Sequence, residues 1–288
     1  MAPRPARTLV PLLVLTALVA LSGCGPSSRT GGDEMALTVT RDYGRTDVIA
    51  LQHERVPEKG ELARVLQRYA NPRDTESLFV NGILVAKPAA QLEIHGGDRV
   101  WLDQHDRGIA PAIPAVVGAF PEPFVHGSDG KRLPVRVECE NPRAGACSAV
   151  AEKLVALGVV AGRSIISRSA ADETLRILVG PWKRLRGRDF EADSIDAGPR
   201  SSGVYARFDP SGDRLVVLDP AGGHARTLGA GTGLIAATRE TNRQPVWFVT
   251  GTDEAGVAAA ARALDESVLA DRFALAISAD LPVAVPQP

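Results

Sequence analysis

The sequence predicts an α+β protein, in which a small β-grasp domain is followed by a larger α/β sandwich domain with a mixed sheet. Three observations lead to this prediction. Hydrophobic residues make up 44% of the 288 positions, which is enough to fill a core. Residues 37–107 show two strand patterns, one helix pattern and three further strand patterns in that order. Residues 134–288 alternate strand patterns with helix patterns, which is typical of an α/β sheet.

The charge balance and the hydropathy exclude two classes of protein. The chain has 33 Lys and Arg against 34 Asp and Glu, so its formal net charge is −1. Because a protein that neutralises phosphates needs a surplus of positive charge, we expect no nucleic-acid partner. The only long apolar run of the sequence lies at the N-terminus, which excludes a multi-span membrane protein.

The N-terminal segment predicts export and lipid anchoring. Two arginines precede an apolar run at residues 9–21, and this run is too short to span a bilayer comfortably, which is typical of a secretory signal peptide. Leu21-Ser22-Gly23-Cys24 resembles a bacterial lipobox, which implies a lipoprotein signal peptide at residues 1–23, a lipidated Cys24 and a place on the extracytoplasmic side of the cell membrane. The alternative is an ordinary signal peptide followed by an unmodified cysteine. Residues 24–36 are mostly Gly, Ser, Pro and polar, so we expect a flexible tether.

The two remaining cysteines, Cys139 and Cys147, predict a disulfide. An exported chain meets an oxidising compartment, and the short segment between the two cysteines contains Asn, Pro and Gly, which allow a tight return. The alternative is a reactive thiol at Cys147, whose pKa would fall near a helix N-terminus.

Residues 37–107 predict the β-grasp domain. Strand patterns are expected at 37–43 and 48–53, and a helix pattern follows at 61–69, bracketed by Gly60 and Pro72. Asn81-Gly82 is typical of a hairpin turn and separates strands at 78–80 and 83–85. A last strand is expected at 99–103. In this order the helix crosses one face of a small mixed sheet.

Three motifs in this unit also carry a family resemblance. They are Thr38-Val39-Thr40-Arg41-Asp42-Tyr43-Gly44, then Val80-Asn81-Gly82, then Gly97-Asp98-Arg99-Val100-Trp101. Their order and spacing resemble the extracellular β-grasp domain related to the C-terminal domain of transcobalamin and intrinsic factor. The resemblance covers about 70 residues, a quarter of the chain, and implies capture of a small molecule, for example a corrinoid, beside an uptake transporter. It makes Asn81, Gly82 and Trp101 candidate ligand-binding residues.

The remaining chain predicts a linker and a second domain. Prolines at 111, 114, 121 and 123 make residues 108–133 a poor helix or strand former, so we expect a semi-rigid Pro-rich linker. Residues 134–288 predict an α/β domain of unknown function with a mixed sheet of about six strands. Its expected strands are at 135–139, 174–179, 203–208, 214–218, 234–238, 245–250 and 273–277, and its expected helices are at 147–157 and 254–264.

Two places in this second domain are candidates for ligand contact. Trp182 follows Gly180-Pro181 at the exit of a strand and has Arg184 among its basic neighbours, so an exposed indole there would stack on a planar or sugar ligand. The alternative is a tryptophan folded onto the sheet. The strand-to-helix junction at 250–253 offers amide groups to an anion, although Asp253 would equally serve as a helix cap.

We find no catalytic signature, no metal site and no cofactor motif in the sequence, so we expect a non-enzymatic lipoprotein that binds a small molecule, an uptake transporter or another envelope partner. Asp103 and His105 share a strand face but lack further ligands for a metal. One alternative is an envelope assembly module that pairs an edge strand with a partner. Another is an envelope hydrolase that uses Ser202 and His224.

Overall fold

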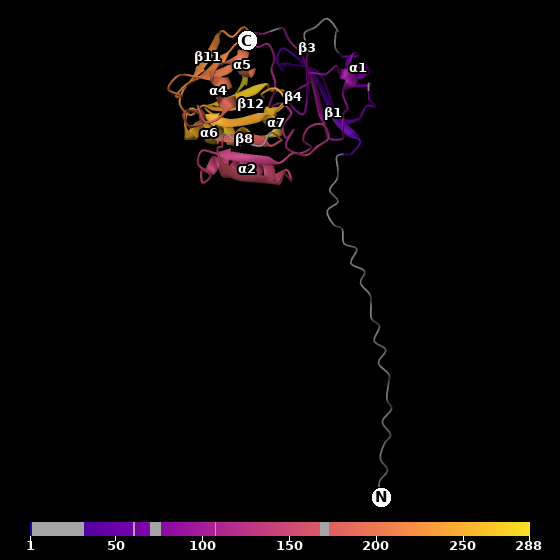
Figure 1. Ribbon diagram of the computed structural model, residues 1–288, viewed down its shortest axis with the longest axis horizontal. Helices are drawn as coiled ribbons and strands as arrows, with labels where there is room; N and C mark the ends of the chain where they lie inside the picture. Colours follow the sequence, from indigo (N-terminus) through magenta and orange to yellow (C-terminus); the bar gives the residue numbers. More distant parts are fainter. Residues whose placement is uncertain (2–31, 60, 70–75, 107, 168–172) are drawn as a thin grey trace. The chain divides into compact units, whose positions relative to one another are not determined.

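The computed structural model describes Met1 and residues 32–59, 61–69, 76–106, 108–167 and 173–288. The expected signal peptide, the lipidation site Cys24 and most of the tether lie outside the described residues. Residues 31–288 form one compact unit of mixed α/β structure, and it contains three sheets (Figure 1). Among the described residues, no helix has the length and apolar character needed to cross a membrane.

The first sheet has five strands in the order β2-β1-β5-β3-β4. Its two central strands, β1 and β5, run parallel, and the other neighbours are antiparallel. Alternate side chains of β5 face opposite sides, because Val100 and Leu102 join the core beneath helix α1 whereas Trp101 joins the core of the second sheet. The bounds are β1 (Glu34–Arg41), β2 (Thr46–Arg55), α1 (Glu61–Leu66), β3 (Glu76–Val80), β4 (Ile83–Leu84), the 3-10 turn η1 (Ala89–Gln91) and β5 (Arg99–Gln104).

The second sheet has seven strands in the order β15-β14-β12-β13-β8-β6-β7. Strands β7, β6, β8 and β13 run parallel, and β12, β14 and β15 are each antiparallel to a neighbour. The bounds are β6 (Val135–Cys139), β7 (Ala161–Ile165), β8 (Leu175–Pro181), β12 (Gly233–Thr238), β13 (Val246–Gly251), β14 (Ala274–Ser278) and β15 (Leu281–Val285).

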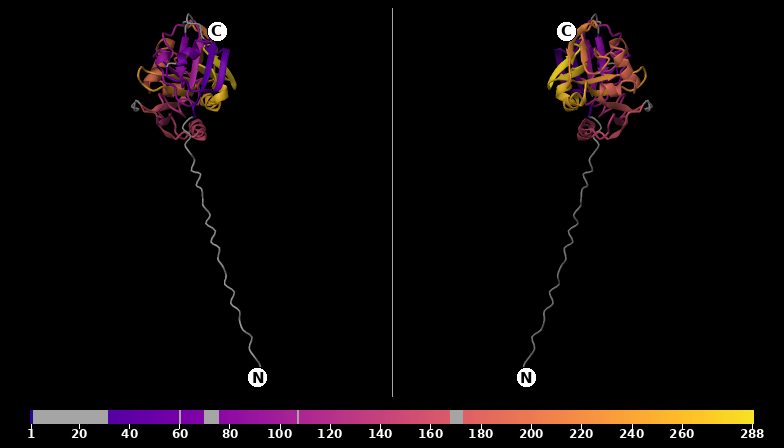
Figure 2. Two further views of the ribbon diagram at one scale, coloured as in Figure 1. Left: turned by 90° about the vertical axis from the view of Figure 1, so that its right-hand side faces the viewer. Right: turned by 90° about the vertical axis from the view of Figure 1, so that its left-hand side faces the viewer.

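Both faces of the seven-stranded sheet are buried. Trp247 and Val249 on one face pack with helices α2 (Gly145–Ala156) and α6 (Glu254–Ala263), and Phe248 on the other face packs with the third sheet. Figure 2 shows the same unit from two further sides. The third sheet is antiparallel, in the order β11-β10-β9. The remaining bounds are α3 (Trp182–Leu185), α4 (Phe190–Asp196), α5 (Pro199–Ser202), β9 (Ala206–Phe208), β10 (Leu215–Leu218), β11 (His224–Leu228) and α7 (Glu266–Leu269).

The segment 108–133 is part of the core. We expected a semi-rigid linker there, yet Val116, Val117, Phe120 and Phe124 are among its buried side chains. The backbone of Leu84 donates to the carbonyl of Pro114, and the amide of Val117 donates to the carbonyl of Phe273. The prolines prevent regular secondary structure, but the apolar residues between them fill the space between the first and second sheets. The segment therefore joins these sheets rather than spacing them apart.

The predicted disulfide between Cys139 and Cys147 is confirmed. It joins the end of β6 to the first turn of α2, with 6.0 Å between the two Cα atoms. Both cysteines are fully buried, so a reactive thiol at Cys147 is excluded.

Candidate functional site

A cleft of about 410 Å³ lies between the first sheet and the connection from β12 to β13. One wall comes from β3, β4 and the chain that follows them, and the opposite wall comes from residues 239–244. Apolar side chains of the first wall face charged and amide side chains of the second. The lining residues are Val80, Ile83, Leu84, Val85, Ala86, Lys87, Leu92, Glu93, Asp98, Ser128, Asp129, Arg239, Asn242, Arg243 and Gln244.

Arg239 is a half-buried cation in the lining of this cleft. It directly follows β12. Among the described residues, its guanidinium makes no hydrogen bond and no ion pair; Asp129 is the nearby acid, and it is exposed. Burial lowers the pKa of Arg239, and the charge of Asp129 opposes this effect only in part. A guanidinium that loses water without gaining an acceptor is unfavourable, so an anionic group beside Arg239 would be favourable.

Two other charged groups of the cleft are already engaged. Asp98 is buried and accepts hydrogen bonds from the side-chain amide of Asn81 (2.7 Å) and from the backbone of His95 (2.8 Å). Arg243 lies 3.4 Å from a carboxylate oxygen of Glu240. Burial raises the pKa of Asp98 in spite of its two donors. We therefore expect Asp98 to compete only weakly with an anionic ligand for the guanidinium of Arg239.

Asn81 and Gly82 lie between the lining residues Val80 and Ile83 and are held by packing and hydrogen bonds. The Asn81 amide donates to the carbonyl of Gly127 (2.9 Å), and its oxygen accepts from the backbone of Arg99 (2.9 Å). Gly82 has a φ of +75°, and a Cβ there would lie 2.7 Å from the carbonyl oxygen of Val116. Both residues are buried, so the turn is fixed against segment 108–133.

Trp101 is mainly a packing residue, although it also contributes to the lining of a second cleft, beside α7. It is buried, its indole NH donates to the hydroxyl of Thr40 (2.8 Å), and its ring packs against Phe79 and Phe273. Phe273 comes from the chain just before β14, so Trp101 belongs to the contact between the first and second sheets.

Trp182 does not offer the exposed stacking surface that we expected. It is 0% exposed, its ring stacks on Phe208 with 4.8 Å between centroids, and its NH donates to Asp196 (3.0 Å). The turn of helix after Pro181 folds the indole back onto the sheet. Arg184 is exposed, and without the indole it is an isolated surface cation.

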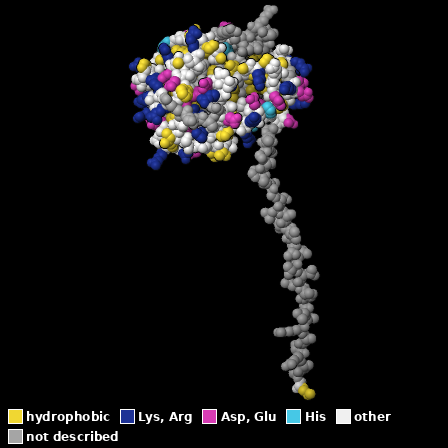
Figure 3. Space-filling view, viewed as in Figure 1, with side chains coloured by type: hydrophobic (Ala, Val, Ile, Leu, Met, Phe, Trp, Pro, Cys, Tyr) yellow, Lys and Arg dark blue, Asp and Glu magenta, His cyan; other side chains and the backbone are white. Residues whose placement is uncertain are grey.

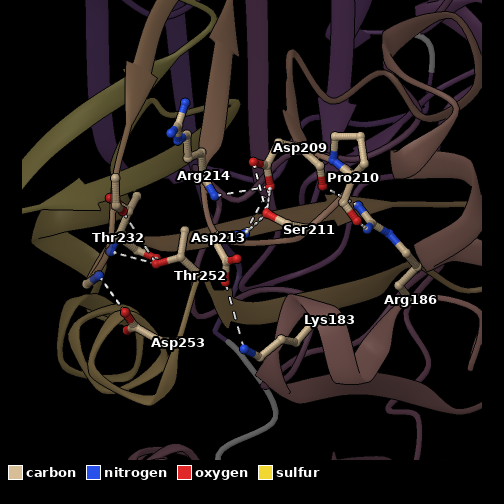
Figure 4. A network of polar contacts seen from close by, with 12 residues as sticks. Lys183, Arg186, Asp209, Pro210, Ser211, Asp213, Arg214, Thr232, Thr252 and Asp253 are labelled. Carbon is tan, nitrogen blue, oxygen red and sulfur yellow. Dashed lines mark hydrogen bonds and ion pairs between the residues drawn. The ribbon is translucent and has the colours of Figure 1, made fainter.

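Two other basic neighbours of Trp182, Lys183 and Arg186, lie in a polar network that follows β8 (Figure 4). Arg186 donates to the backbone carbonyls of Asp209 (2.9 Å) and Pro210 (2.6 Å), and Lys183 lies 3.8 Å from a carboxylate oxygen of Asp213. Asp209 also accepts from the hydroxyl of Ser211 (2.9 Å). These contacts order the loop before β10 and leave Arg186 without capacity for an anion.

The strand-to-helix junction at 250–253 is a helix cap. The carboxylate of Asp253, which is labelled in Figure 4, accepts from the backbone of Gly256 and of Gly231, each at 2.8 Å. The hydroxyl of Thr252 accepts from the backbone of Thr232 at 3.1 Å. A second anion at this end of α6 would meet the negative charge of Asp253.

The remaining sequence candidates have local partners. Asp103 is fully buried and binds His105 Nδ1 (2.6 Å) and two backbone amides, and the described residues contain no cluster of three metal-ligating side chains. Ser202 is buried and donates to the carbonyl of Gly198 (3.1 Å). His224 is exposed and contacts the hydroxyl of Thr227. In the part of the chain that is described, no hydrogen bond joins Ser202 to His224.

A second cleft, of about 560 Å³, lies between β1, β2 and β5 and the chain around α7. It is lined by three acids, and burial together with the charge of Asp47 raises the pKa of Asp271 to about 6. However, Arg99 and Glu266 form an ion pair in this cleft, so the positive charge of Arg99 and the negative charge of Glu266 neutralise each other. The cleft at Arg239 is therefore the stronger candidate for a charged ligand.

The sequence analysis did not single out Arg239. The residue stands between a buried strand and the polar run Glu240-Thr241-Asn242-Arg243, where a solvent-exposed arginine is the ordinary case. Its half-buried position depends on the approach of the first sheet, which is distant in sequence. Comparison of the chain with protein-family models and with curated proteins gives no match.

Proposed function

We propose that this protein is a lipid-anchored, non-enzymatic binding protein of the cell envelope, which holds a small anionic molecule in the cleft at Arg239. The lipobox-like segment before Cys24 supports the anchor and the extracytoplasmic location. The half-buried guanidinium of Arg239, which has no hydrogen-bond acceptor among the described residues, carries the binding role. A carboxylate or a phosphate would supply that acceptor with a charge-assisted hydrogen bond.

The lining of the cleft narrows the chemical class of the ligand. Val80, Leu84 and Leu92 offer apolar surface opposite Arg239, so an organic anion with a short apolar part fits better than an inorganic ion. A volume of about 410 Å³ falls at the lower end of the range of about 300–1,000 Å³ usual for small-molecule sites. This size favours a small organic acid over a macrocycle such as a corrinoid.

The arrangement of the first sheet supports the β-grasp proposal. The sequence predicted a helix across one face of a small mixed sheet, and the observed sheet is mixed, with the strand order β2-β1-β5-β3-β4, a parallel pair β1-β5 and α1 against one face. The resemblance to the transcobalamin-related family stays part of this proposal, with a ligand smaller than a corrinoid. For the second part of the chain we propose an α/β sandwich, supported by the two buried faces of the seven-stranded sheet.

One observation favours a second candidate, the assembly module. Strand β2 is an edge strand of ten residues, and its outer side is unpaired among the described residues. Such an edge can accept a partner strand through backbone hydrogen bonds.

Native mass spectrometry of the protein purified from its own envelope extract tests both candidates. We expect a retained small-molecule adduct in the wild type. Arg239→Met should reduce adduct occupancy about tenfold or more, because the ligand loses its charge-assisted contact. Arg214→Met removes the same charge from an exposed position and should keep the adduct. A clean mass with a stoichiometric protein partner would favour the assembly module, and equal occupancy in both variants would refute the role of Arg239.

A further inference from the structure

Exposed apolar side chains gather where helix α2 ends. Val155, Leu157 and Val160 are 62%, 38% and 92% exposed. Together with Ile165 they are four of the eight large hydrophobic side chains that are exposed in the described part of the chain. Single exposed apolar residues are ordinary on protein surfaces, whereas several within a short stretch mark an interaction site. We call Val155, Leu157 and Val160 the α2 end patch.

The α2 end patch lies on the same side of residues 31–288 as the start of β1. Ala36 of β1 pairs with Arg99 of β5, and Arg99 forms an ion pair with Glu266 of α7. The ammonium of Lys153, near the end of α2, donates to the carbonyl of Leu264, just before α7 (2.9 Å). Figures 1 and 2 agree with these contacts, because α2 and the beginning of β1 lie at the lower side of the folded unit in every view.

The length of chain before β1 limits how far this side can be from a lipid anchor. Asp33 follows Cys24 by nine positions. At about 3.4 Å for each residue, even a fully extended chain reaches only about 30 Å. An anchor at Cys24 therefore keeps the side of the protein that carries the start of β1 close to the bilayer.

We propose that the α2 end patch rests on the lipid bilayer and inserts its aliphatic side chains among the acyl chains. This proposal depends on the lipid anchor at Cys24 that belongs to the proposed function. The chemistry of the patch fits a lipid surface, because its three members are aliphatic and exposed.

Charged side chains close to the patch bear on its insertion into a bilayer. On the face shown in Figure 3, apolar side chains lie among acidic and basic ones, along the lower edge as elsewhere. Lys153 directs its ammonium to the carbonyls of Arg262 and Leu264, so this cation is turned toward the protein, whereas Glu152, three residues before Val155, is exposed and would have to stay at the headgroup level. Insertion of the patch therefore does not require this ammonium to lose its partners.

A nitroxide placed on the patch tests the proposal directly. In the mature lipidated protein Cys24 would be blocked by its thioether, and Cys139 and Cys147 are joined in a disulfide, so Val160→Cys supplies the sole free thiol. The labelled protein is reconstituted in vesicles of phosphatidylglycerol and phosphatidylethanolamine. Electron paramagnetic resonance then compares accessibility to oxygen, which dissolves in lipid, with accessibility to a water-soluble nickel complex. Leu281→Cys is the matched control, because Leu281 is also exposed and lies on β15, the opposite edge strand of the seven-stranded sheet.

We expect the ratio of oxygen to nickel accessibility to be roughly threefold or more higher at position 160 than at position 281, as for side chains buried about 5–10 Å into the interface. Adding Val155→Asp should lower the ratio at 160 toward that at 281. Equal ratios at both positions would overturn the proposal. Protection from both reagents at 160 would indicate a second copy or another protein on the patch and would also overturn it. A failed anchor is recognised separately, because Cys24 would then take up the label.

Discussion

We expect Glu191→Gln to stabilise the protein at neutral pH and to leave its stability unchanged in acid. Glu191 lies in a buried cluster with Asp189, Arg176 and Glu138. Arg176 contacts both carboxylate oxygens of Glu138 (3.0 and 2.9 Å) and one of Asp189 (2.8 Å), so its guanidinium is engaged by two other carboxylates and acts on Glu191 only through its charge. Burial, followed by the hydrogen bond and the charge of Asp189, raises the pKa of Glu191 from its ordinary value of 4.5 to about 7.

The sign and the size of the effect follow from proton linkage. At a pH below 4.5, the pKa of Glu191 in the unfolded chain, this carboxyl is protonated in both the folded and the unfolded state. Its ionisation then makes no contribution to the free energy of unfolding. As the pH rises from 4.5 toward about 7, the unfolded chain ionises while the folded protein keeps its proton, so stability falls and then stays low. A tenfold difference in proton affinity corresponds to ~1.36 kcal/mol, which sets an upper value of roughly 3 kcal/mol for the loss. Gln keeps the shape of the side chain and does not titrate.

Urea denaturation followed by tryptophan fluorescence measures this difference, because all three tryptophans are buried. The advantage of Glu191→Gln over the wild type should be near zero at about pH 4 and should grow to about 1–3 kcal/mol at about pH 8. Glu152→Gln changes an exposed glutamate on α2 and should show no such trend. An advantage of Glu191→Gln that is the same at both pH values would refute the reasoning.

Two further predictions concern the core. Trp182→Ala should destabilise the protein by about 3–5 kcal/mol, because it removes a fully buried indole, its stacking on Phe208 and its hydrogen bond to Asp196; a calorimetric Tm close to that of the wild type would contradict this. Replacing both Cys139 and Cys147 by Ser should cost about 2–3 kcal/mol through loss of the short closed loop. Reduction of the wild type in the same denaturation assay should produce a similar loss, and no change on reduction would show that the disulfide contributes little.

Local patterns predicted most of the strands and helices, because the periodicity of apolar residues depends only on positions that are close in sequence. The alternation at 37–43 corresponds to β1, and the Ala-rich helix pattern at 254–264 corresponds to α6. Strand β7 was missed because Ala161–Ile165 lies at a sheet edge and is largely exposed, so its sequence lacks a buried face. Strand β15 was also missed, because Pro282 lowers its strand propensity. The proline is tolerated there because β15 is an edge strand. The hairpin of β9 and β10 was expected in the main sheet, but it belongs to a separate sheet with β11.

The candidate site was harder to predict, because burial of a polar or aromatic residue is decided by distant segments. Trp182 was expected to meet solvent, but α4 and β9 supply Asp196 and Phe208 and enclose it. Arg239 shows no local signal, and its partial burial arises where β4 approaches the β12–β13 connection. Composition was misleading in the segment 108–133, since prolines suggested a spacer where the intervening apolar residues fill a core.

The buried course of segment 108–133 determines how far the walls of the Arg239 cleft can move apart. The two walls of the cleft belong to sheets that are joined through Val116, Val117 and Phe273, so a hinge opening would expose apolar core. The cleft is thus preformed and open to solvent. It differs from a binding site between two domains that close over a ligand. A ligand would meet little reorganisation cost on entry, and its residence time would be set by the contacts of the cleft itself. Handing the ligand to a membrane partner would require that partner to compete for the guanidinium, without any help from a conformational change.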